Sequence, residues 1–169
     1  MITEEYVQMN KALHSKNPIY GVSSKHHHAY IRHLISEKKI TAVLDYGCGK
    51  GILRQKLGPM VREYDPAVSG KDAAPEPAQL VCCIDVLEHI EPECLDAVLD
   101  HLRELTLEVL YLTVACYAAK KHLADGRNAH LIQKPPKWWL PKLMKRFNLE
   151  SFQSKTKADG DRAFTALLT

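Results

Sequence analysis

Three closely spaced glycines follow one apolar segment of the sequence and predict a ligand-binding turn. They lie in "VLDYGCGKG" as Gly47, Gly49 and Gly51, and Asp45 precedes them. Glycine lets a backbone approach a ligand closely and adopt positive φ angles. Asp65 lies 20 residues beyond Asp45, where a carboxylate can accept hydrogen bonds from two ribose hydroxyls. These residues predict a site for a cofactor that contains a nucleoside.

Strands and helices alternate around this turn. Apolar, β-branched segments predict buried strands, and apolar residues at intervals of three or four predict helices. The Pro-, Gly- and Ala-rich residues 65–79 predict neither. We expect strands at 40–47, 60–65, 80–87 and 107–115, a closing antiparallel pair at 149–155 and 163–169, and helices at 27–39, 51–58, 91–106 and 136–147.

This alternation indicates an α/β fold with a mostly parallel sheet and helices on both faces. In such a sheet the ligand lies at the carboxyl ends of the strands. At 169 residues the chain is expected to form a single domain, with residues 27–169 as its core and residues 1–26 as an N-terminal lid or extension. The segment 20–28 is the expected closing part of that lid.

Three motifs resemble, in their order, those of class I S-adenosylmethionine-dependent methyltransferases. They are "VLDYGCGKG", "EYDPA" and "CIDVLEHI". The resemblance runs from about residue 27 to the C-terminal "AFTALLT", which is similar to the antiparallel last strand of that family. It implies a Rossmann-like three-layer sandwich that binds S-adenosylmethionine and transfers its methyl group to an acceptor.

The resemblance also implies which residues bind this cofactor. The acidic residue and the glycines of the first motif hold the methionine part and the ribose, and the acid of the second motif holds the ribose hydroxyls. Cys48 is expected to be a small filler beside the cofactor rather than a nucleophile. The implied set is Asp45, Tyr46, Gly47, Cys48, Gly49, Gly51, Asp65, Asp85, Val86 and Leu87.

One region departs from the family pattern. Between Asp65 and Asp85 the family has a helix, a strand and a second acidic loop that contacts adenine, whereas this chain has a short Pro- and Ala-rich stretch. We therefore expect the third strand to be shortened or lost, which leaves six strands. Asp72 and Ala73 are the weak candidates for the adenine contact.

The third motif supplies the candidate catalytic residues. Glu88 and His89 resemble part of the ExxEH ligand set of metal-dependent O-methyltransferases, although Asp85 stands where that set has its first Glu, and His130 is a later histidine. Such oxygen and imidazole ligands suit magnesium, manganese or zinc. Two alternatives stay open: Glu88 and His89 form only local hydrogen bonds, or His89 is a general base without a metal.

The segment "DGRNAHLIQKPPKWW" after the strand at 107–115 is the candidate acceptor-binding region. It concentrates polar and aromatic side chains in a loop, and loops often carry functional residues. We expect Arg127, Asn128 and Trp138 to bind substrate together with His130, while Trp139 is either a core residue or a further contact.

Composition narrows the acceptor only coarsely. The net charge of +3 is modest for a nucleic-acid binder, so a small-molecule acceptor is expected and a nucleic acid or nucleotide is the alternative.

The five cysteines have no CxxC spacing, and "MITEEYVQMN" is no secretory signal, so the protein is expected to be cytoplasmic with no membrane partner. A non-catalytic scaffold is a second class of function. A nicotinamide-dependent oxidoreductase is the third, and the GxGxG spacing disfavours it.

Overall fold

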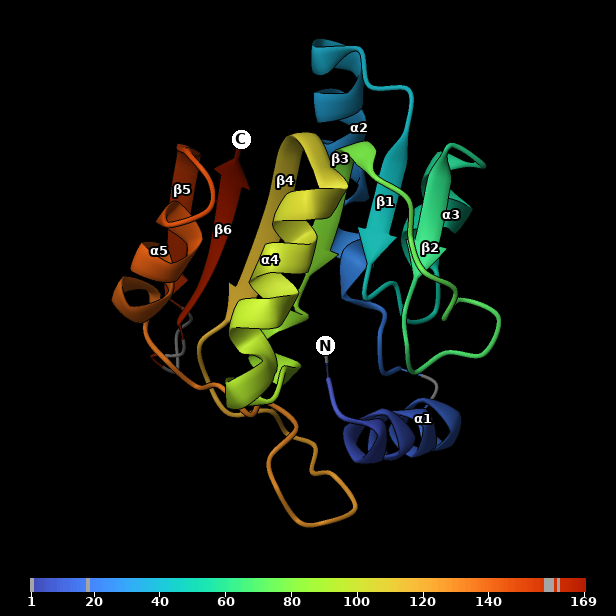
Figure 1. The fold of residues 1–169 in the computed structure, drawn as a ribbon, viewed down its shortest axis with the longest axis vertical. Coiled ribbons are helices and arrows are strands. Elements are labelled where there is room, and N and C mark those ends of the chain that lie inside the picture. Colours follow the sequence, from blue (N-terminus) through green and yellow to red (C-terminus); the bar gives the residue numbers. More distant parts are fainter. Residues whose placement is uncertain (1, 18, 157–159, 161) are drawn as a thin grey trace.

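A six-stranded sheet lies between two layers of helices in the computed structural model of the protein (Figure 1). The structure describes residues 2–17, 19–156, 160 and 162–169. The strands are β1 (Val43–Tyr46), β2 (Val61–Tyr64), β3 (Ala78–Ile84), β4 (Thr106–Ala115), β5 (Leu149–Thr156) and β6 (Arg162–Leu168). Their order in the sheet is β2-β1-β3-β4-β6-β5.

The first four strands are parallel and the last is antiparallel, as predicted. Strand β1 pairs with β2 and β3, β3 pairs with β4, and β6 is antiparallel to both β4 and β5. Because β1 to β4 run in the same direction, the residues that follow them meet at one edge of the sheet. The glycine turn, Asp65, Asp85 and the loop after β4 therefore converge there.

The expected loss of the third strand is confirmed. Residues 65–77 run from β2 to β3 without forming a helix or strand. They fold as a tight loop in which Asp65 N–H donates to the carbonyl of Lys71 at 2.8 Å. Asp72 and Ala73, the candidates for the adenine contact, are exposed on this loop and do not line the cavity described below.

The helices form one layer on each face of the sheet (Figure 1). The helix α4 buries the leucine and valine face predicted for it, and it shares one core with α5, which contributes the fully buried Trp139. The opposite core contains Ile31, Leu34 and Leu53 from α2 and α3. These helices are α2 (His28–Lys38), α3 (Ile52–Leu57), α4 (Leu95–Leu105) and α5 (Pro136–Met144), with 3-10 turns η1 (Ser23–His26), η2 (Leu87–His89) and η3 (Pro92–Cys94).

The sequence analysis missed the first helix, α1 (Glu4–Lys16). The Thr3 side chain caps it by accepting from Tyr6 N–H, and the Thr3 hydroxyl donates to the Glu91 carboxylate at 2.8 Å. Its buried residues are only Tyr6 and Asn10, so the sequence has no broad apolar stripe that would predict a helix. Figure 1 shows α1 lying across the carboxyl ends of the strands.

Every helix among the described residues is too short or too polar to cross a lipid bilayer.

Candidate functional site

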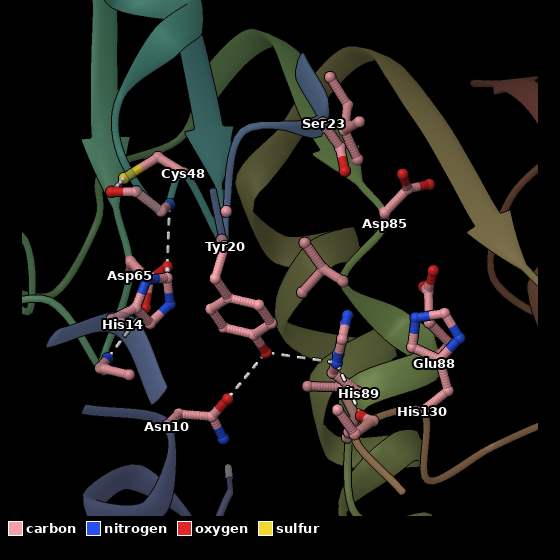
Figure 2. A pocket seen from close by; sticks show the side chains of 18 of the residues that line it. Asn10, His14, Tyr20, Ser23, Cys48, Asp65, Asp85, Glu88, His89 and His130 are labelled. Carbon is pink, nitrogen blue, oxygen red and sulfur yellow. Dashed lines mark hydrogen bonds and ion pairs between the residues drawn. The ribbon is translucent and has the colours of Figure 1, made fainter. Parts of the chain in front are cut away.

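A cavity of about 400 Å³ lies at the carboxyl edge of the sheet, beneath α1 (Figure 2). Cavities of this size, roughly 300–1,000 Å³, enclose small-molecule ligands. Its walls come from three parts of the chain: the N-terminal segment, the turns after β1 to β3, and the loop after β4.

The glycine turn after β1 forms one wall and leaves no room for side chains. Gly47 has a φ of 73°, and a Cβ there would overlap the side chain of Val86. A Cβ on Gly49 would come within 2.7 Å of the Gly21 Cα, because the N-terminal segment packs directly on the turn. Lys50 N–H donates to the Gly21 carbonyl at 3.0 Å and holds this contact. The glycines therefore let Val86 and the covering N-terminal segment pack directly against the turn.

Asp45 lies near the end of β1 and is a buried carboxylate that lines the cavity. Among the described residues, none is a hydrogen-bond partner of its Oδ2. Burial, reinforced by the nearby Glu63 carboxylate, raises the pKa of Asp45 to about 7. A buried polar atom without a partner is costly, and a hydrogen-bond donor on a ligand would remove that cost.

Asp65 follows β2 and already holds two backbone groups. Its Oδ2 accepts from Gly49 N–H and its Oδ1 accepts from Ala67 N–H, both at 2.9 Å. His14 Nε2 lies 4.0 Å from Oδ2. Each carboxylate oxygen has a second lone pair, so the same carboxylate can also accept from a ligand in the cavity.

Asp85 follows β3 in a left-handed conformation, with a φ of 53°. Its Oδ1 accepts from the Thr113 hydroxyl at 2.7 Å, which fixes the side chain beside β4. Non-glycine residues with positive φ often mark functional sites.

Most of the other residues implied as cofactor contacts also line the cavity. They are Tyr46, Cys48 and Val86. Burial raises the pKa of the Cys48 thiol, which agrees with a filler rather than a nucleophile. Leu87 instead lies in the hydrophobic core, and Gly51 lies outside the cavity beside Glu63 and Lys71.

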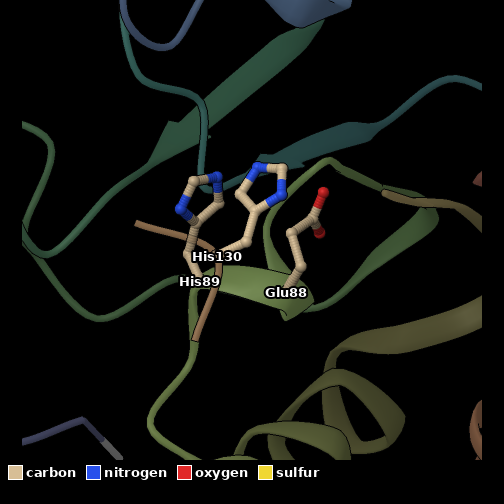
Figure 3. A group of neighbouring side chains, drawn as sticks. All are labelled: Glu88, His89 and His130. Carbon is tan, nitrogen blue, oxygen red and sulfur yellow. The ribbon is translucent and has the colours of Figure 1, made fainter. Parts of the chain in front are cut away.

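Glu88, His89 and His130 come together at the other end of the cavity (Figure 3). One potential ligand atom from each lies within 4.8 Å of the others. Glu88 is fully buried; its Oε1 accepts from Ala115 N–H at 2.9 Å, whereas its Oε2 has no partner in the part of the chain that the structure describes. Burial, together with Asp85, raises the pKa of Glu88 well above its ordinary value.

Both histidines are oriented by backbone carbonyls. His89 Nδ1 lies 2.7 Å from the carbonyl oxygen of Ala129, and His130 Nδ1 lies 2.6 Å from that of Tyr117. A carbonyl oxygen only accepts, so each Nδ1 carries a hydrogen, and in a neutral ring the lone pair then lies on Nε2. The His89 bond spans 40 residues and the Glu88 bond spans 27, so the alternative in which Glu88 and His89 form only local hydrogen bonds is wrong.

Burial lowers the pKa of His89 to about 4, with a smaller effect from His130. The ring is therefore neutral at pH 7. A base with so low a pKa drives proton removal weakly, because general bases work best near the operating pH.

The N-terminal segment covers the cavity (Figure 2). The Tyr6 hydroxyl donates to the carbonyl of His89, and the Tyr20 hydroxyl donates to Asn10 Oδ1 at 3.1 Å. Tyr20 stands in the middle of the cavity between Asp65 and His89, and its hydroxyl lies 3.4 Å from His89 Nδ1. Its ring packs edge-on against His14 with centroids 4.7 Å apart.

Of the four predicted substrate-binding residues, Arg127, Asn128 and Trp138 do not line the cavity, whereas His130 does. The loop after β4 turns at Asp125 and Gly126, so Arg127 lies exposed at its tip, where its Nε is 2.6 Å from an Asp125 carboxylate oxygen. Asn128 instead fixes the loop: its Oδ1 accepts from Ala119 N–H and His130 N–H, both at 2.9 Å. The residues of this loop that line the cavity are Tyr117, Ala119, Lys120, Lys121, Ala129 and His130.

Trp138 lies on α5, away from the cavity. It packs against the core and under the Lys142 ammonium, 4.7 Å from the ring centroid. Helix α5 covers the sheet face rather than its carboxyl edge, which explains why neither tryptophan meets the cavity.

Comparisons with known structures identify the fold of the chain. No protein-family model matches the sequence, and no curated protein matches it significantly. The 1,6-didemethyltoxoflavin-N1-methyltransferase of Burkholderia thailandensis, solved with 1,6-didemethyltoxoflavin and S-adenosylhomocysteine, superposes with a TM-score of 0.68 over 99% of this chain and 90% of that chain, at 14% identity. The chain has the class I methyltransferase fold.

Two further structures with the methyltransferase fold superpose on most of the chain. The N-methyltransferase NodS of Bradyrhizobium japonicum WM9, in complex with S-adenosylhomocysteine, gives a TM-score of 0.64 over 96% of this chain and 97% of that chain, at 13% identity. The methyltransferase domain of bacterial CtHen1-CN gives 0.62 over 86% and 98%, at 13% identity.

Within this methyltransferase fold, the sequence analysis missed the polar N-terminal wall of the cavity. Tyr6, Asn10 and His14 are spaced by four residues and therefore share one helix face. That spacing could have been noticed in the sequence. However, a polar helix face normally indicates exposure to solvent, so the spacing alone does not predict a cavity wall. Tyr20, in a turn after α1, carries no comparable pattern.

Proposed function

We propose that the protein is a methyltransferase that uses S-adenosylmethionine and acts on a small molecule. One observation carries the proposal: Asp45, the glycine turn and Asp65 line one cavity at the carboxyl edge of a sheet with this fold.

The residues at this edge fit the cofactor. The unpartnered Oδ2 of Asp45 suits a hydrogen-bond donor of the methionine part or the ribose. The second lone pairs of Asp65 suit the ribose hydroxyls, and Gly47 and Gly49 bring the backbone of the turn to the cavity wall. Val86 and Asp85 flank the same space.

When bound, the cofactor supplies a methyl group on a sulfonium, which is already a good leaving group. The protein has to align an acceptor with that methyl, exclude water and remove a proton where the acceptor is a hydroxyl or ammonium. The N-terminal segment, through Tyr6, Asn10 and Tyr20, closes the cavity and excludes water. Glu88, His89 and His130 lie on the acceptor side, next to Ala115 at the end of β4.

A divalent metal ion at Glu88, His89 and His130 is a second element of the proposal. An unpartnered buried carboxylate oxygen and two imidazoles oriented through Nδ1 by carbonyls form a typical oxygen and nitrogen donor set. The low pKa of His89 favours a ligand over a general base, since a ligand must be neutral. Such an ion would lower the pKa of an acceptor hydroxyl.

A small acceptor is favoured over a nucleic acid by the position of the basic and aromatic side chains. Arg127 is paired with Asp125, and Trp138 stacks with Lys142 on another face. Neither side chain lies on a surface continuous with the cavity. A nucleic-acid acceptor would need such a basic or aromatic surface beside the cavity.

Titration calorimetry tests the cofactor assignment. We expect S-adenosylmethionine and S-adenosylhomocysteine to bind with micromolar Kd, and NADH not to bind. Absence of binding by all three would favour a scaffold without methyltransferase activity.

A metal titration tests the second element. Mn²⁺ should bind the chelator-treated protein, as followed by electron paramagnetic resonance, and His130→Ala should abolish that binding. His122→Ala is the matched control, because His122 is exposed on the same loop and should bind as the wild type does. Equal Mn²⁺ binding by both variants would remove the metal from the proposal.

A further inference from the structure

Lys121 lies on the cavity wall because the loop after β4 folds back, and unlike the exposed Lys120 it is partly buried. Leu123 N–H donates to the Arg127 carbonyl at 2.8 Å, and Ala129 N–H donates to the Lys121 carbonyl at 2.9 Å. This narrow hairpin sets Lys121 beside His130 in the cavity lining. The Lys121 ammonium lies 4.9 Å from the centroid of the Tyr20 ring.

The Lys121 ammonium lacks a carboxylate partner. Among the described residues, none of the Asp or Glu oxygens lies within 4.0 Å of its Nζ. The neighbouring cations differ: Lys71 pairs with Glu63 at 3.0 Å, and the Lys50 ammonium donates to the His14 carbonyl at 2.8 Å. The face of the Tyr20 ring attracts the cation but does not neutralise it.

The surroundings of Lys121 leave its charge uncompensated. Lys121 is half-buried, and burial lowers its pKa. Burial also lowers the pKa of the His14 ring, which packs edge-on against Tyr20. A half-buried charge without a partner is unfavourable, and an anionic ligand would compensate it.

From this arrangement we infer that Lys121, seated over Tyr20, binds a carboxylate or phosphate group of a ligand in the cavity. The inference rests on the proposed function and deepens it. Two sources share this chemistry: the α-carboxylate of the cofactor, or an acidic group on the acceptor. In either case the Lys121 ammonium donates to the anion while Tyr20 holds the lysine side chain in place.

Binding measurements on three proteins separate the sources: the wild type, Lys121→Met and the control Lys137→Met. Methionine keeps the length of the lysine side chain and removes its charge, and Lys137 is an exposed lysine of α5 outside the cavity. The first probes are S-adenosylhomocysteine and 5′-methylthioadenosine, which lacks the amino-acid group. The second probe is inorganic phosphate, titrated into the protein saturated with S-adenosylhomocysteine and followed by amide chemical shifts of residues 119–130.

Either of two results supports the inference. If the anion is the cofactor carboxylate, Lys121→Met binds S-adenosylhomocysteine at least tenfold more weakly and 5′-methylthioadenosine as the wild type does. If the anion belongs to the acceptor, S-adenosylhomocysteine binds unchanged, while phosphate shifts the loop resonances in the wild type and Lys137→Met but not in Lys121→Met.

The inference is overturned if the wild type binds S-adenosylhomocysteine and Lys121→Met changes neither its affinity nor the response to phosphate. Failure of the wild type to bind S-adenosylhomocysteine would instead refute the proposed function, and the inference with it.

Discussion

Substitution of Asp45 by asparagine should change how the stability of the ligand-free protein depends on pH. The pKa of this carboxyl is raised from its ordinary value of 3.8 to about 7, chiefly by burial. An acid whose pKa is higher in the folded state stabilises the fold below its unfolded pKa, and this contribution is lost as the pH rises through the folded pKa. Between about pH 4 and pH 7 the wild type should therefore lose stability relative to Asp45→Asn, which lacks this titrating group.

The size of the effect follows from the pKa difference. A difference of this size corresponds to about 4 kcal/mol, since each pH unit is worth about 1.4 kcal/mol. For a domain of about 150–250 residues, 1 kcal/mol shifts Tm by roughly 2–4 °C, so the two proteins should diverge by on the order of 10 °C. Any fixed cost of burying the asparagine amide displaces the variant curve equally at all pH values.

The assay is urea unfolding of the wild type, Asp45→Asn and the control Asp72→Asn from pH 4 to pH 8, without cofactor. Asp72 is exposed, so its variant should follow the wild-type curve. Parallel curves for the wild type and Asp45→Asn would refute the account, because they would mean that Asp45 is ionised in the folded protein throughout this range.

Three further variants test the cavity and the core. Asp65→Ala should weaken S-adenosylhomocysteine at least tenfold in calorimetry and lower Tm, because it also removes the acceptor of Gly49 N–H; wild-type affinity would disprove the ribose assignment. Trp139→Ala should lower the free energy of unfolding by about 3–5 kcal/mol in urea, since Trp139 is fully buried; a loss under 1 kcal/mol would contradict its core position. Arg127→Ala should leave cofactor binding and stability nearly unchanged, because its exposed ion pair contributes under about 1 kcal/mol. A large loss of affinity for the cofactor would contradict the placement of Arg127 outside the site.

The sequence predicted the sheet and the glycine turn after β1 well, because both depend on local patterns. Apolar strands and the leucine face of α4 are periodic, and the expected segments differ from the observed elements by a few residues at their ends. Asp45 and the glycines act through the strand and turn that carry them, so their position follows directly from that local structure.

The acceptor side was predicted less well, because long-range contacts set its side-chain directions. Arg127 and Asn128 are neighbours in the sequence, but their side chains point in different directions. The turn at Asp125 leaves Arg127 exposed, whereas the Asn128 side chain accepts a hydrogen bond from His130 N–H within the loop. Lys121 enters the cavity only because the loop returns along itself. No local pattern of residues encodes that return.

The most direct test of the central claim is a crystal structure of the protein with S-adenosylhomocysteine. The account predicts that the ribose hydroxyls lie within hydrogen-bond distance of Asp65 and that the sulfur faces the end of the cavity with His89 and His130. A ligand bound outside this cavity, or bound within it with its ribose away from Asp65, would contradict the account.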